Sequence, residues 1–119
     1  MILADTSIWI DHLNRNDAEL ARRLEAGLIL AHPFVIGELA LSNLRQLALI
    51  LGALRDLPQA MVASDDEVLS FIERQDFNGR GIGYVDAHLL ASIRLTPDAR
   101  LWTRDKRLLN VAAALDRGA

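Results

Sequence analysis

Four acidic residues of this sequence stand where a chemical role is as plausible as a structural one. Asp5 directly follows the apolar run ILA, and Asp105 comes two residues after the apolar segment ARLWT. Glu38 lies in the apolar segment PFVIGELAL, and Asp86 shares a helical face with leucines, so both are expected on inward faces near the starts of helices. Taken singly, Asp5 or Asp105 could cap a helix, and Asp86 could be a first-turn acid favoured by the helix dipole.

Brought together, four carboxylates would define a metal site. At 4 Å and an effective dielectric constant of 20, each pair of like charges costs about 4 kcal/mol, so protons or cations must relieve the repulsion. Oxygen ligands alone favour Mg²⁺ or Mn²⁺ over zinc. Such ions can activate a water and stabilise the leaving oxygen of a phosphodiester, which predicts a metal-dependent nuclease.

The surrounding elements would position these acids at one edge of a sheet. Short apolar segments alternate with segments of helical periodicity, which predicts an α/β fold with a mostly parallel sheet covered on both faces. Ligands of such sheets bind beyond the carboxyl ends of the strands. The expected strands are 1–5, 28–31, 59–63 and 99–103. The expected helices are 6–13, 17–26, 33–42, a leucine-rich helix that contains Leu44 and stops at Pro58, a helix that starts at the capping box 64–67, 84–95 and 104–115.

One further acid and two hydroxyls follow the first strand. Thr6 or Ser7 is expected to cap the first helix and to support the site, which leaves Asp5 free as a metal ligand. Asp11 is expected to be an ordinary acid of that helix. His12, His32 and His88 have no ligand-like spacing to the acids and are interpreted as structural or surface residues.

Composition fits one globular domain over residues 1–119. The absence of cysteine excludes a disulfide framework and a thiolate metal site. The most apolar stretch, 34–51, contains charged residues, and no basic leader precedes the first strand, so a cytoplasmic protein without a membrane span is expected. The apolar residues of 34–57 fit either a buried helix pair or a partner interface.

The pieces DTSIWID and LWTRDKRL, a Glu in an apolar helix and an Asp that opens a helix after a glycine-rich loop resemble the PIN domain. Within this family the VapC group of toxins from bacterial toxin–antitoxin pairs is the most similar. The resemblance covers nearly the whole chain. It implies a three-layer α/β/α sandwich with a mostly parallel sheet of four to five strands, and an Mg²⁺- or Mn²⁺-dependent endoribonuclease that cleaves structured RNA such as tRNA or rRNA.

The same resemblance assigns roles to individual residues and partners. Asp5, Glu38, Asp86 and Asp105 match the acidic metal-binding and catalytic positions, and Thr6 and Thr103 match supporting hydroxyls. The resemblance also implies a homodimer held by a VapB-like antitoxin whose tail blocks the site. The chain departs from the family pattern in ending at ALDRGA, so the fifth strand could be short, absent or rebuilt.

Basic residues near the acids are candidates for RNA contacts. Arg80 lies in the loop NGRGIG, and Arg104, Lys106 and Arg107 surround Asp105, so we expect these four to contact phosphates, with solvated surface charge as the alternative. With six aromatic residues, recognition of RNA shape and backbone is favoured over base stacking.

Two other functions fit the pattern less well. A phosphoryl-receiver domain needs an Asp directly after the third strand, whereas QAMVAS ends without one. A PIN-like module that binds RNA or protein without cleaving remains open, although all four acids are present.

Overall fold

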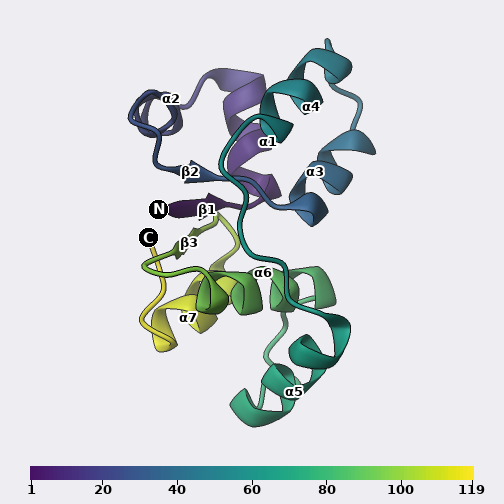
Figure 1. Cartoon of the computed structure of the whole chain (residues 1–119), viewed down its shortest axis with the longest axis vertical. Coiled ribbons are helices and arrows are strands. Elements are labelled where there is room, and N and C mark those ends of the chain that lie inside the picture. Colours follow the sequence, from purple (N-terminus) through teal and green to yellow (C-terminus); the bar gives the residue numbers. More distant parts are fainter.

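A parallel sheet crosses the middle of the molecule (Figure 1). The computed structural model describes residues 1–119, and its sheet has the strand order β2–β1–β3. The central strand β1 (Ile2–Ala4) pairs in parallel with β2 (Ile29–Leu30) on one side and with β3 (Arg100–Trp102) on the other. The parallel α/β architecture expected from the sequence is therefore confirmed.

The predicted strand 59–63 is reduced to a single bridge at its first residue. Only Gln59 forms a parallel bridge, to Ala31, and the ladder ends with the hydrogen bond from the Ala60 N–H to the Ala31 carbonyl. The next residue, Met61, donates its N–H to the Thr96 hydroxyl at 3.0 Å. The chain leaves the sheet at this point because its backbone pairs with the end of a helix instead.

The C-terminal segment closes the opposite edge of the sheet. Gly118 forms a parallel bridge to Leu101, with the Leu101 N–H donating to the Arg117 carbonyl at 2.7 Å and the Ala119 N–H donating to the Leu101 carbonyl at 3.0 Å. Parallel pairing thus extends by one short bridge beyond each outer strand. The fifth strand that the sequence left open is reduced to this bridge.

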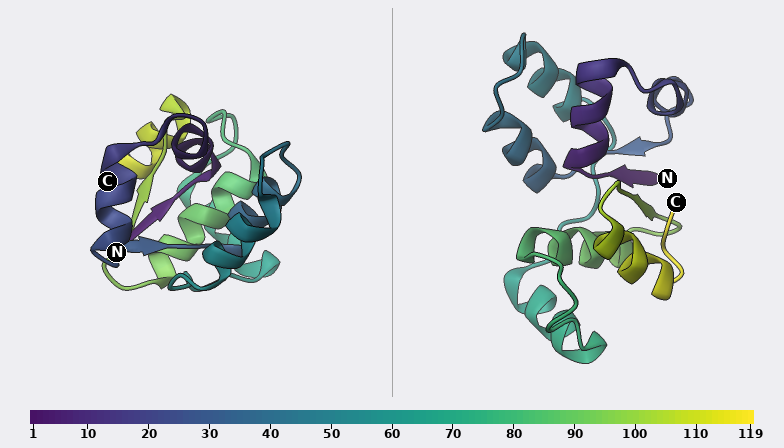
Figure 2. Two further views of the ribbon diagram at one scale, coloured as in Figure 1. Left: turned by 90° about the horizontal axis from the view of Figure 1, so that it is seen from above. Right: turned by 180° about the vertical axis from the view of Figure 1, so that it is seen from behind.

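The helices form two groups at opposite ends of the molecule, whose longest dimension is 40 Å (Figure 1). Seen from behind, one group of helices lies on each face of the sheet (Figure 2, right). None of them combines the length and apolar character that crossing a bilayer requires. One group contains α1 (Thr6–Arg15), α2 (Ala18–Glu25), α3 (Pro33–Ala40) and α4 (Leu47–Arg55), and the other contains α5 (Asp65–Gln75), α6 (Tyr84–Leu95) and α7 (Lys106–Ala114).

The core follows from the continuous apolar strands and from α6. Leu3 of β1 and Leu101 of β3 are fully buried, as expected of strands covered on both faces. In α6 all residues from Ala87 to Ile93 are buried, which makes it the central helix. The leucine-rich helix begins later than predicted, because Leu44 precedes the turn at Arg45 and Gln46 that leads into α4. This buried centre fixes the positions of the polar residues that lie at the ends of β1 and β3 and at the start of α6.

Candidate active site

Asp5 is held at the end of β1 by several donors. One carboxylate oxygen accepts the Ser7 hydroxyl at 2.5 Å and the Ile8 N–H at 3.3 Å, and the other accepts the Thr103 hydroxyl. Asp5 itself is therefore the N-cap of α1, which corrects the expectation that Thr6 or Ser7 would cap this helix. The hydroxyls point at Asp5 instead, because a buried carboxylate needs donors.

Glu38 faces solvent, which contradicts its predicted inward position. Its apolar neighbours Val35 and Leu39 fill the buried side of α3 and turn the carboxylate outward. The Thr6 hydroxyl donates to Glu38 Oε1 at 2.7 Å. Thr6, which follows Asp5 in the sequence, therefore links Glu38 to the end of β1.

Asp86 lies half-buried in the first turn of α6. Its carboxylate accepts the Gly83 N–H at 3.0 Å, a bond that favours the charged form. Burial nevertheless raises the pKa of Asp86 above the ordinary value, and the negative charges of Asp105, Asp5 and Glu38 raise this pKa further. The fold thus brings all four predicted acids within electrostatic reach of one another.

Asp105 caps α7 by accepting the Arg107 N–H at 2.9 Å and the Leu108 N–H at 3.2 Å, both on Oδ1. Its own N–H donates to the Thr103 hydroxyl at 3.0 Å, and that hydroxyl donates in turn to Asp5. The structural interpretation of Asp105 as a cap is correct. Asp105 is exposed, and its second carboxylate oxygen accepts none of these bonds, which leaves it available to a ligand.

We call Asp5, Glu38, Asp86 and Asp105 the acidic quartet. None of the ion pairs in the molecule involves a member of the quartet. No three of these side chains converge closely enough to form a ready ligand set for a metal. The donor set still fits Mg²⁺, which usually keeps several waters and needs only one or two direct carboxylates.

Arg104 does not have the free guanidinium expected of a phosphate contact. It pairs with Asp11 at 3.1 Å and with Asp17, and it lies 5.7 Å from the centre of the Trp102 ring. The backbone N–H of Arg104 also donates to the Ser7 hydroxyl at 3.0 Å. Sequence reasoning missed this ion-pair group because α1, the start of α2 and the end of β3 meet only in the folded chain.

The other three candidate RNA contacts keep free positive charges. Arg80, Lys106 and Arg107 are exposed and have no carboxylate partner. Gly81 has a φ of +80°, and a Cβ at this position would lie 2.6 Å from Cδ of Arg107. Gly81 therefore allows the Arg107 side chain to lie against the glycine-rich loop.

The histidines are structural, and one of them positions α3. His32 is fully buried, accepts the Phe34 N–H at 3.0 Å as the N-cap of α3 and contacts the Ser92 hydroxyl at 2.8 Å. Burial lowers the pKa of His32 to about 4, so it stays neutral at pH 7. Its position before Pro33 was the signal for a cap that the sequence interpretation overlooked.

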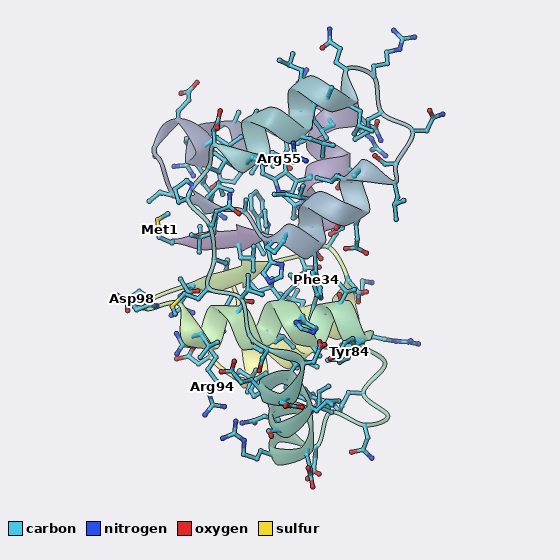
Figure 3. The ribbon with its side chains drawn as sticks, turned by 45° about the vertical axis from the view of Figure 1, so that its right-hand side comes forward. Met1, Phe34, Arg55, Tyr84, Arg94 and Asp98 are labelled. Carbon is cyan, nitrogen blue, oxygen red and sulfur yellow. The ribbon has the colours of Figure 1, made fainter.

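His88 joins α5 and α6. Its Nε2 lies 3.0 Å from Asp65, which also accepts the Tyr84 hydroxyl at 3.0 Å. The rings of Phe34 and Tyr84 pack against His88 at centroid distances of 4.4 and 4.8 Å, and Figure 3 shows Phe34 and Tyr84 on the same side of the molecule. These contacts fix the start of α6, and with it Asp86, relative to α3.

Acids beyond the carboxyl ends of parallel strands lie where α/β sheets of this kind bind their ligands, and the comparison with known proteins gives the family. Residues 2–114 match the PIN domain family model, so the chain belongs to the PIN domain family. It is also similar to Ribonuclease VapC32 of Mycobacterium tuberculosis, from strains CDC 1551 / Oshkosh and ATCC 25618 / H37Rv. Each match is 51% identical over 111 residues and covers 91% of this chain and 87% of the relative. The resemblance inferred from the sequence is confirmed.

Proposed function

We propose that this protein is a metal-dependent endoribonuclease of the VapC type, a hydrolase of phosphodiester bonds. The observation that carries the proposal is the acidic quartet: burial raises the pKa of Asp86, the charges of the other three carboxylates raise it further, and none of the four has a basic partner. The high identity to a protein named as a ribonuclease supports the same activity.

The quartet holds Mg²⁺ or Mn²⁺ in this proposal, with Asp5 and Asp86 as the most enclosed ligands. When bound, the metal supplies a water of lowered pKa and stabilises the leaving oxygen of the phosphodiester. The chain contributes orientation: Ser7 and Thr103 hold the Asp5 carboxylate, and Thr6 holds Glu38. Asp105 offers its second oxygen from the start of α7.

The substrate is a structured RNA such as tRNA or rRNA. Arg80, Lys106 and Arg107 are its phosphate contacts, because they are exposed, unpaired and close in sequence to Asp86 or Asp105. Arg104 does not belong to this set, because its guanidinium forms ion pairs with Asp11 and Asp17. These positive side chains would attract the RNA backbone to the edge of the sheet where metal ions bind the acidic quartet.

The protein acts in the cytoplasm as a homodimer bound by a VapB-like antitoxin. Exposed apolar residues at the α3–α4 end support a partner surface, since Leu41 is 91% exposed and Leu49 is 71% exposed. The absence of cysteine is compatible with a reducing compartment.

Cleavage of a tRNA transcript by the purified protein tests the proposed activity. We expect cleavage with Mg²⁺ or Mn²⁺, none with a chelator, and none by Asp5→Asn. Asn can still cap α1, so this variant should keep its circular dichroism spectrum and melting temperature. Asp11→Asn is the matched control and should cleave normally. Undiminished cleavage by Asp5→Asn would refute the metal-site assignment, and a folded but inactive wild type would leave a PIN-like binding module.

A further inference from the structure

A cavity lined by two arginines lies near the C-terminal end of α6, away from the acidic quartet. Its volume is about 220 Å³, and its charged lining residues are Arg94 and Arg117. The remaining lining residues are apolar: Phe71, Leu90 and Leu115. Figure 3 shows Arg94 and Tyr84 at opposite ends of α6.

Packing holds both arginines in place. The guanidinium of Arg94 lies 5.3 Å from the centre of the buried Phe71 ring. The backbone of Arg117 donates to the Ala112 carbonyl at 2.8 Å and accepts the Leu101 N–H at 2.7 Å. The C-terminal bridge to β3 therefore delivers Arg117 to a fixed position beside α6.

The two positive charges are not compensated within the chain. Neither Arg94 nor Arg117 has a carboxylate oxygen within 4.0 Å of its guanidinium, so neither forms an ion pair. Two guanidinium groups around one small cavity repel each other, and a bound anion would relieve this repulsion. The planar guanidinium presents paired N–H donors that match the oxygens of a phosphate.

The neighbouring cavity provides an internal contrast. It is larger, about 460 Å³, and shares Phe71 and Arg94 with the smaller one. Its charged lining residues are two acids, Asp66 and Glu67, and two arginines, Arg74 and Arg94, so the charges there balance. Only the smaller cavity combines positive charge with an absence of acidic lining residues.

We propose that the Arg94–Arg117 cavity binds a backbone phosphate of the RNA whose cleaved bond lies at the acidic quartet. This inference rests on the proposed ribonuclease function. Arg94 follows Asp86 by eight residues on α6, which is about 12 Å along the helix axis. Because the middle of α6 is buried, an RNA that reaches both places passes over the elements that cover this helix, and the cavity anchors it at a distance from the cleaved bond.

RNA affinity measured without divalent metal tests the cavity separately from cleavage. A fluorescein-labelled tRNA transcript is titrated with wild type, Arg94→Gln and Arg117→Gln in EDTA, at several salt concentrations, with fluorescence anisotropy as the readout. We expect each variant to raise Kd about three- to tenfold and to reduce the slope of log K against log salt by about 0.7 to 1. Arg55→Gln removes the same charge at the opposite end of the molecule (Figure 3) and should bind like wild type.

Three outcomes decide the proposal. Loss of RNA affinity in Arg94→Gln and Arg117→Gln but not in Arg55→Gln supports it. Equal affinity in all three variants overturns it. A cavity that binds inorganic phosphate or AMP by calorimetry, while both variants bind RNA like Arg55→Gln, also overturns it and assigns the site to a free phosphate compound. Failure of wild type to cleave with Mn²⁺ would instead count against the proposed function.

Discussion

Two groups of acidic residues lie near the carboxyl ends of β1 and β3, and they differ in what compensates their charge. The Arg104 group consists of Asp11 and Asp17 with Arg104 between them as a shared cation. The acidic quartet has hydroxyl and backbone N–H donors but no cation from the chain. Asp5 and Asp11 lie only six residues apart in the sequence, yet they belong to different groups.

The difference separates stability from function. A carboxylate with an arginine partner lowers the energy of the folded chain by a modest amount and has little left to offer a ligand. Carboxylates gathered without a cation raise the energy of the folded chain until a cation arrives. We therefore interpret the Arg104 group as a structural clasp between α1, α2 and β3, and the quartet as the metal-binding site.

The largest expected difference is in activity. Asp86→Asn should lower RNA cleavage by at least about 100-fold, because it removes a carboxylate from the metal site. Asp11→Asn should change cleavage less than about twofold. Initial rates on the same RNA at saturating Mn²⁺ measure both effects, and similar rates for the two variants would abolish the distinction between the groups.

The next effect concerns stability, and here the Arg104 group should matter more than it does for activity. Arg104→Ala should lower the free energy of unfolding by about 1 kcal/mol, because it breaks two surface ion pairs and a contact with Trp102. Urea unfolding of Arg104→Ala, Asp17→Asn and the double variant measures the coupling. Arg104→Ala should keep most of its cleavage activity, and its complete loss would place Arg104 in the catalytic machinery after all.

The smallest effect is a difference in pH dependence without divalent metal. The pKa of Asp17 is lowered, chiefly by the Leu20 N–H and also by Arg104, so its contribution to stability is present above the unfolded pKa and is lost as the pH falls through the folded one. The pKa of Asp86 is raised, so protonation at low pH favours the folded chain and this advantage disappears as the pH rises through the folded pKa.

Melting temperatures between pH 3 and pH 7 in EDTA measure this difference. Asp86→Asn should be more stable than wild type near pH 7 and should lose that advantage in acid. Asp17→Asn should be less stable near pH 7 and should converge with wild type in acid. The same sign for both variants would show that the two groups do not differ in charge compensation.

Local sequence patterns predicted the ends of β1 and β3 well. Asp5 and Asp105 were found because an apolar run that stops at an acid is visible in the sequence. Glu38 was placed correctly in α3 but with the wrong exposure, since apolar neighbours show the buried side of a helix and not which side the acid takes.

Long-range contacts explain the remaining differences. Nothing near Arg104 in the sequence shows that Asp11 and Asp17 will reach it, and nothing in ALDRGA shows that Arg117 will be fixed beside Arg94. The segment 59–63 has the composition of a strand, yet the Met61 N–H donates to the Thr96 hydroxyl and not to a neighbouring strand. These features depend on which elements meet in three dimensions.

The effect of Mn²⁺ on thermal unfolding tests the central claim most directly. At a Mn²⁺ concentration 100 times Kd, binding to the folded chain should stabilise wild type and Asp11→Asn by about 2.7 kcal/mol, whereas Asp5→Asn should gain little. The account predicts a rise in melting temperature that requires Asp5 and does not require Asp11. An equal rise in Asp5→Asn and wild type would contradict it.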